Sequence, residues 1–355
     1  MKTMELLEEF YQERNITWST RKVYENSIRV YMEVNEMSLE ELLEEAEEEE
    51  EAGLRWKHRS LRKRLIRYQN YLLENYNYST TIQYYGRVKT FYHHHNIEIH
   101  NLPPLNKKQA HLSEPIHYQD LPTKEVLKKA YDLANPVMKA IILFSISTGC
   151  GKTEILNFTR DDYYNWIDPY TPQEILEKNI DIVPTIYTTR QKTNHHYFTF
   201  ATPESIKEIA KYLETRDDNK PVLFKIQYKY MSILFNKYNN ALGLGRKNNC
   251  RILRSHMLRK FHASQLSMGE NRLTLDEIDS LQGRVKQDTR KSYYYSNPED
   301  LKKKYIRNMD KVTILDKVHT ITLDSPEVEQ LKRKAAKIDE LEKLVKQIME
   351  RSERG

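Results

Sequence analysis

The sequence predicts a mainly helical fold with a small β-sheet. An all-helical N-terminal domain precedes an α+β domain, and a C-terminal helix follows. Three observations predict this: helical periodicity without strand signals in residues 1–100, a proline-containing segment at 101–121, and two β-rich runs among helices in 122–315. A chain of 355 residues exceeds one typical domain, and only nine glycines argue against a doubly wound nucleotide-binding fold.

The N-terminal domain, 1–100, is expected to hold four or five helices. Ser38 and Glu41 form a capping-box pattern before a helix over 39–50. We expect Ser19/Thr20 and Ser79/Thr80 to open two further helices, and apolar residues at helical spacing predict another over 61–73.

The linker is expected at 101–121, because Pro103, Pro104 and Pro115 stand there among polar residues, with Pro122 just after. Within the second domain, 122–315, we expect strands over 180–189 and 196–200. Helices are expected over 123–133, 136–146, 203–213, 229–242, 255–266 and 274–282.

The C-terminal segment, 322–355, is expected to be a helix that forms a marginal coiled coil. Ser325 caps it, Pro326 follows at the first helical position, and Lys334 interrupts the seam. Self-association and a solvated helix docked on its own or a neighbouring domain remain alternatives. The apolar heptad positions are Leu331, Ile338, Leu341, Val345 and Ile348.

Charge points to a polyanionic partner. Lys and Arg number 57 against 51 acidic residues, and the glutamates gathered between Glu40 and Glu51 leave the rest of the chain more basic than the net +6 indicates. Two cysteines, Cys150 and Cys250, favour a reducing interior without structural zinc. No long apolar run is present, so we expect a cytoplasmic, nucleoid-associated protein without membrane contact.

A dense run of cations lies between residues 55 and 67. On one helix they cannot all be paired, so a DNA phosphate backbone is the expected counter-charge. The alternative is a solvated face opposite the acidic run Glu47–Glu51. The cations are Arg55, Lys57, Arg59, Arg62, Lys63, Arg64 and Arg67.

Two motifs that suggest other chemistry do not hold. The run 147–153 ends like a phosphate-binding loop, but the pattern requires glycine where Ile146 stands. His93, His94 and His95 are adjacent on an expected helix and therefore cannot converge on one metal ion.

An ordered set of residues carries the strongest signal. A lysine, Lys192, lies between the two β-rich runs; His256 and Arg259 share one helix face; Gly283-Arg284 ends a helix; and Tyr293 stands ten residues past the glycine. Each piece is common, but their order is specific.

That order resembles the tyrosine recombinases, the phage-integrase and Xer-like family, in its archaeal-type members. "HMLRKFHASQLSMGENRLTLDEIDSLQGRV" is similar to their H-x-x-R to L-G-H run. "TRKSYYYSNPEDLKKKYI" resembles their nucleophile segment, and "FSISTGCGKTEILNFTRDDY" resembles their first box. The resemblance spans about 122–305 and implies an integrase of a mobile element that acts in DNA recombination.

The resemblance implies a role for each motif residue. Tyr293 would attack a DNA phosphate, Arg259 would clamp that phosphate, His256 would assist proton movements and Lys192 would protonate the leaving 5′-oxygen. Arg284 stands where the family has His or Trp. The resemblance further implies a tetramer on double-stranded DNA, clamped between a core-binding domain and the catalytic domain, with no cofactor or metal.

One departure concerns the first-box arginine. Gly151 holds its usual place, counted back from Glu154, and Lys152 is the nearest cation. We expect Lys152 to substitute, although lysine offers a point charge where arginine offers two parallel hydrogen bonds. The alternative is a DNA-binding homologue with weak or no cleavage.

Overall fold

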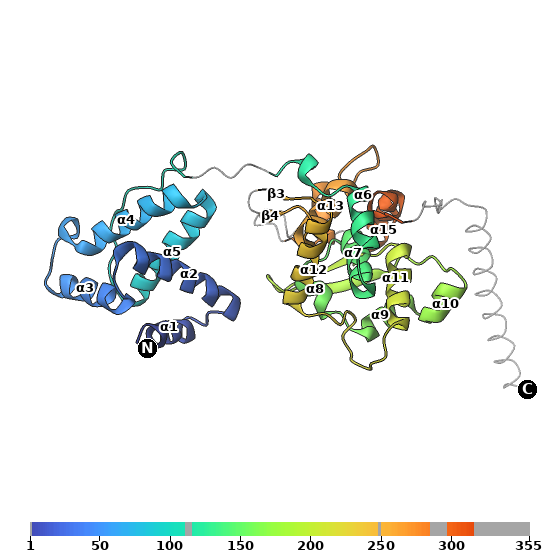
Figure 1. Cartoon of the computed structure of the whole chain (residues 1–355), viewed down its shortest axis with the longest axis horizontal. Coiled ribbons are helices and arrows are strands. Elements are labelled where there is room, and N and C mark those ends of the chain that lie inside the picture. Colours follow the sequence, from blue (N-terminus) through green and yellow to red (C-terminus); the bar gives the residue numbers. More distant parts are fainter. Residues whose placement is uncertain (1, 111–115, 248–249, 285–296, 316–355) are drawn as a thin grey trace, which may run out of the picture. The chain divides into compact units, whose positions relative to one another are not determined.

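The computed structural model describes residues 2–110, 116–247, 250–284 and 297–315. It confirms a mainly helical chain with a small antiparallel sheet. Backbone contacts divide the chain into two compact units, Met1–Pro115 and Ile116–Gly355 (Figure 1), and the division falls within the expected linker. The C-terminal segment at 322–355 lies outside the described residues.

The first unit is helical throughout its regular structure. Its helices α2, α4 and α5 pack on one another around an aromatic core. The hydroxyls of Tyr31 and Tyr92 lie 3.0 Å apart, and Tyr68 donates to the Ser27 carbonyl at 2.9 Å, so these three buried phenols keep hydrogen-bond partners. The elements are α1 (Lys2–Glu13), α2 (Trp18–Asn35), α3 (Leu39–Glu51), the 3-10 turn η1 (Trp56–His58), α4 (Ser60–Asn75) and α5 (Tyr78–His94).

The helix starts in this unit are partly as expected. The capping box of Ser38 and Glu41 is present at α3, which confirms that start. The expected caps at Ser19/Thr20 and Ser79/Thr80 are wrong: both pairs lie inside the first turn. The cap of α5 is Asn77, whose side-chain oxygen accepts from the Thr80 backbone N–H at 2.9 Å.

The second unit surrounds one apolar helix, α7, which packs against α11 and α13. Residues from Ala140 to Thr148 are all buried, which explains its lack of a polar face. The helical elements are η2 (Tyr118–Asp120), α6 (Lys124–Asp132), α7 (Pro136–Thr148), α8 (Lys152–Asn157), α9 (Arg160–Ile167), α10 (Pro172–Glu177), α11 (Pro203–Glu214), α12 (Tyr228–Ala241), α13 (Ser255–Leu266), α14 (Leu275–Leu281), α15 (Pro298–Asn308) and η4 (Met309–Val312).

A β-hairpin carries the turn in which the sequence places its candidate lysine. Strand β1 (Thr185–Arg190) pairs antiparallel with β2 (His195–Phe200), and Arg190 lies opposite His195. The expected first strand began at Ile180; it begins later because Pro184 has no N–H to contribute to a ladder. Two-residue strands β3 (Arg246–Lys247) and β4 (Cys250–Arg251) form a second small sheet, which was not expected.

Candidate anion-binding site

Two helix ends meet on α13 in the second unit. Gly149 follows α7 and Gly283 follows α14, both with left-handed backbone, at φ +64° and +58°. A Cβ at Gly149 would lie 2.6 Å from His262 Nδ1, and a Cβ at Gly283 would lie 2.4 Å from the Tyr197 ring. Only glycine fits these positions, and the close approach brings backbone carbonyls to the middle of α13.

Gln282 connects the two helix ends. Its side chain is fully buried, and its Nε2 donates to the Arg259 carbonyl at 3.0 Å and lies 3.0 Å from His262 Nδ1. Its own carbonyl accepts from Arg259 Nη2 and, at 3.3 Å, from Arg190 Nη1. One residue therefore fixes both the backbone and the guanidinium of Arg259.

Arg259 is a buried cation held by carbonyl groups. It is 6% exposed, and its Nη1 donates to the Gly149 carbonyl at 2.7 Å. No acidic side chain forms an ion pair with it in the part of the chain that the structure describes. Burial lowers its pKa, and the neighbouring Arg190 lowers that pKa further. A buried guanidinium without a carboxylate is suited to an external anion.

His256 lies in the first turn of α13, on the face that leads to Arg259. Its pKa is lowered by partial burial and then by Lys260, Arg254, Arg259 and Arg284, a set of cations around one imidazole. The ring is therefore neutral near pH 7, and it can accept or donate one proton.

His262 is the second histidine of α13 and is fully buried. Its pKa is lowered to about 3, first by burial and then by Arg259 and Arg284. It stays neutral, and its packing against Gly149 and Gln282 makes it a support for Arg259.

Lys192 and Arg284 are two further cations that the sequence assigned to the site. Lys192 is exposed in the turn between β1 and β2. Arg284 follows Gly283, and its Nη1 lies 3.4 Å from Asp279 Oδ1. Tyr293 lies outside the described residues, so its expected role remains a prediction.

The ammonium of Lys152 contacts α12. Its Nζ donates to the Tyr228 carbonyl and, at 2.6 Å, to Ser232 Oγ, and it lies 3.5 Å from the centroid of the Tyr228 ring. Burial lowers its pKa. None of the interactions described for Arg259 involves Lys152, and the phosphate contact expected of Lys152 stays a prediction.

The sequence predicted that the basic run of the first unit lies on one helix. This prediction is wrong, because the run spans η1 and α4. Lys57 lies in η1, Arg55 precedes that turn, and Arg59 is the N-cap of α4. Two cations are paired with the acidic helix α3: Arg59 with Glu50 at 3.3 Å, and Arg64 with Glu45. Within the described ranges, the others form no ion pair; they are Arg55, Lys57, Arg62, Lys63 and Arg67.

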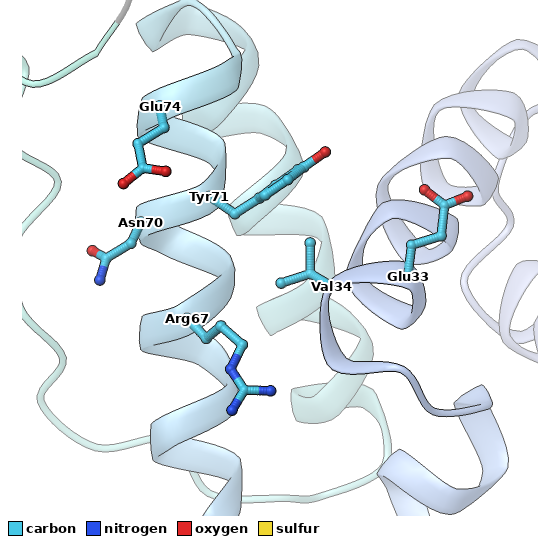
Figure 2. A pocket seen from close by; sticks show the side chains of 6 residues that line it. All are labelled: Glu33, Val34, Arg67, Asn70, Tyr71 and Glu74. Carbon is cyan, nitrogen blue, oxygen red and sulfur yellow. The ribbon is translucent and has the colours of Figure 1, made fainter.

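Arg67 lines a hollow of about 500 Å³ between α2 and α4. Figure 2 shows its side chain with those of the other lining residues. Glu33 and Glu74 line the same hollow, and Glu33 is paired with Arg29 at 2.6 Å. Because both signs of charge are present, the hollow favours neither an anion nor a cation. The remaining lining residues are Val34, Asn70 and Tyr71.

Residues that sequence reasoning missed at the site are Arg190, Gln282 and His262. A cation at the last strand position before a hairpin turn, and a histidine three residues past an H-x-x-R arginine, were the available signals. Among the described residues, no cluster of His, Cys, Asp or Glu is arranged to hold a metal ion. None of the described helices combines the length and the apolar character that a membrane span needs.

No protein-family model and no curated protein matches the chain. Three similar solved structures are a XerA recombinase (16% identity, 86% of this chain and 97% of that one, TM-score 0.34), a XerH site-specific recombinase bound to its difH substrate in a pre-cleavage complex (15%, 68% and 69%, 0.43), and an integrase from mycobacterium phage Brujita (11%, 87% and 91%, 0.39).

Proposed function

We propose that this chain is a tyrosine recombinase, a DNA strand transferase that cuts and rejoins DNA through a 3′-phosphotyrosine intermediate. The observation that carries the proposal is Arg259, a buried guanidinium that carbonyls hold in place and that forms no ion pair with a carboxylate among the described residues. His256 lies on the same helix face. A phosphodiester supplies the missing negative charge and needs such donors as charge develops in its transition state.

The proposed reaction conserves bond energy in two exchanges. The Tyr293 phenolic oxygen attacks phosphorus, a phosphorus–tyrosine bond forms, and the bond to the 5′-oxygen breaks as Lys192 protonates that oxygen. Arg259, with Arg284 and Lys152, stabilises the charge, and His256 handles the tyrosine proton. A free 5′-hydroxyl then attacks the phosphotyrosine and releases the enzyme, so neither metal nor nucleotide cofactor is consumed.

The chain's two units suit a DNA clamp. In this proposal residues 1–100 are the core-binding domain, 101–121 the linker and 122–315 the catalytic domain, acting on double-stranded DNA at the nucleoid. Protomers assemble into a tetramer on DNA, with 322–355 docked on a neighbour. Deleting 322–355 should then leave single-site binding intact and reduce synapsis; a rise in cleavage would instead indicate that the tail inhibits its own protomer.

A non-cleaving DNA-binding homologue is the second candidate. It is favoured by Gly151, where the resemblance leads one to expect arginine, and by the contacts of Lys152 with α12. If Lys152 moves to the phosphate during catalysis, Lys152→Ala lowers cleavage at least tenfold with little change in DNA affinity. Unchanged cleavage in that variant would assign Lys152 a structural role at α12.

The test uses duplexes selected for binding from a random pool and nicked at successive positions, so that cleavage releases a short strand and traps the adduct. We expect a covalent protein–DNA band that is absent in Tyr293→Phe, a variant that still binds the duplex. A matched substrate with sulfur at the bridging 5′ position should restore cleavage in Lys192→Ala, since a thiolate leaves without protonation. Binding without any covalent band, on either substrate, would favour the second candidate.

A further inference from the structure

We propose that Arg190 is the second phosphate-binding guanidinium of the site and takes over the task of the absent first-box arginine; this inference rests on the proposed function. Arg190 is the last residue of β1. Its Nη1 donates to the carbonyls of Gln282 and Gly283, at 3.3 and 3.1 Å. The Gln282 carbonyl also accepts from Arg259 Nη2, so both guanidiniums meet at one oxygen.

The two arginines keep donors free for a ligand. A guanidinium carries five N–H groups, and Arg259 uses one bond from each Nη. Both bonds of Arg190 come from Nη1, which leaves Nε and Nη2 without a partner in the described part of the chain. Neither arginine is paired with a carboxylate there. Two forks that share one acceptor can each offer further N–H groups to one tetrahedral anion.

Electrostatics favour the same occupant. Arg190 and Arg284 both lower the pKa of Arg259, because like charges this close repel one another. Burial makes that repulsion stronger than it is at an open surface. A phosphate bound between the two arginines attracts both guanidiniums. It therefore relieves the repulsion that the site has without an anion, which favours the binding of an anion.

Arg190 fits the vacant role better than Lys152 does. Lysine has no planar fork, and the Nζ of Lys152 is engaged by Tyr228 and Ser232. Gly151 has no side chain, and a Cβ there would lie 2.2 Å from Glu154 Oε2. In this proposal the guanidinium is thus supplied from the end of β1, which follows the first box in the sequence and precedes Arg259.

The competing explanation is that Arg190 only caps α14, because both its acceptors are carbonyls at the end of that helix. A cap contributes stability whether or not an anion is present. Anion binding separates the two explanations, because a clamp contributes to the affinity for phosphate as well.

The first experiment titrates the full chain with inorganic phosphate at constant ionic strength. The ring proton shifts of His256, assigned with His256→Asn, report binding locally. We expect Arg190→Gln to weaken phosphate binding at least tenfold, Arg190→Lys to give an intermediate loss, and Arg272→Gln, an exposed arginine of the same unit, to match wild type. Equal affinity in Arg190→Gln and wild type, or no phosphate response in wild type, would overturn the proposal. Arg190→Lys gives the same comparison if Arg190→Gln does not fold.

The second experiment measures covalent adduct formation on nicked DNA with the same variants. A tenfold or greater loss in Arg190→Gln with unchanged duplex binding supports the clamp, and equal rates in wild type and Arg190→Gln refute it while leaving the proposed function intact. If phosphate binding depends on Arg190 but wild type forms no adduct, the anion site stands and the proposed strand transfer fails.

Discussion

Lowering the pH from about 7 to about 4.5 should destabilise the second unit by about 2.5 kcal/mol through His262 alone. His262 is fully buried beside Arg259, and its pKa falls from 6.5 to about 3 on folding. Below pH 6.5, the His262 imidazole binds a proton in the unfolded chain. In the folded chain the same imidazole stays neutral until the pH approaches its lowered pKa. Stability is therefore present above pH 6.5 and is lost as the pH falls toward the folded value. Each pH unit between these two pKa values changes the free energy of unfolding by about 1.4 kcal/mol.

The comparison variant is His262→Asn. The asparagine side-chain oxygen can still accept from Gln282 Nε2, but the amide does not titrate. The contributions of all other titrating groups therefore cancel when the free energies of unfolding of the two proteins are subtracted. Trp166 stacks on Phe144 in the second unit and serves as the reporter when Trp18 and Trp56 are replaced by Phe.

Urea unfolding at the two pH values gives the free energies. Wild type should lose about 2.5 kcal/mol relative to His262→Asn on acidification. A difference that stays constant with pH would show that His262 titrates normally, and it would refute the account of a buried, cation-surrounded imidazole.

Two further pairs of variants test the packing and the proposed DNA-binding role of the basic run. Gly283→Ala should lower the free energy of unfolding by about 2 kcal/mol more than Gly243→Ala, since both have positive φ but only the former meets the Tyr197 ring; equal losses in urea unfolding would contradict this. Arg62→Gln should reduce the slope of log affinity against log salt by about 0.9 without loss of stability, whereas Arg64→Gln should cost about 1 kcal/mol of stability through Glu45. An unchanged slope would remove Arg62 from the interface.

The long helices were predictable because their periodicity and caps are local. Ser38 and Glu41 mark the start of α3, and the structure agrees. The short helices α8, α9 and α10 were not expected, because six to eight residues do not display an amphipathic period. Capping-box patterns at Thr159 and Thr171 were the signals that could have located two of them.

The candidate site was predictable in part. His256 and Arg259 could be found because residues three positions apart lie on one helix face and stay together wherever that helix packs. Arg190 could not, since its partner Gln282 lies 92 residues away and the contact depends on how the hairpin folds against α14. The ion pairs of Arg59 and Arg64 were missed for the same reason, as they depend on α3 lying beside α4.

The most direct test of the account is to identify the amino acid that carries DNA in the covalent adduct. Trypsin digestion followed by nuclease treatment and mass spectrometry should find a nucleotide 3′-phosphate on Tyr293, within the peptide from Ser292 to Lys302. An adduct on Tyr294 or Tyr295 would correct the nucleophile. An adduct outside this peptide, or none after complete binding of nicked DNA, would contradict the proposal that the chain transfers DNA strands through a tyrosine.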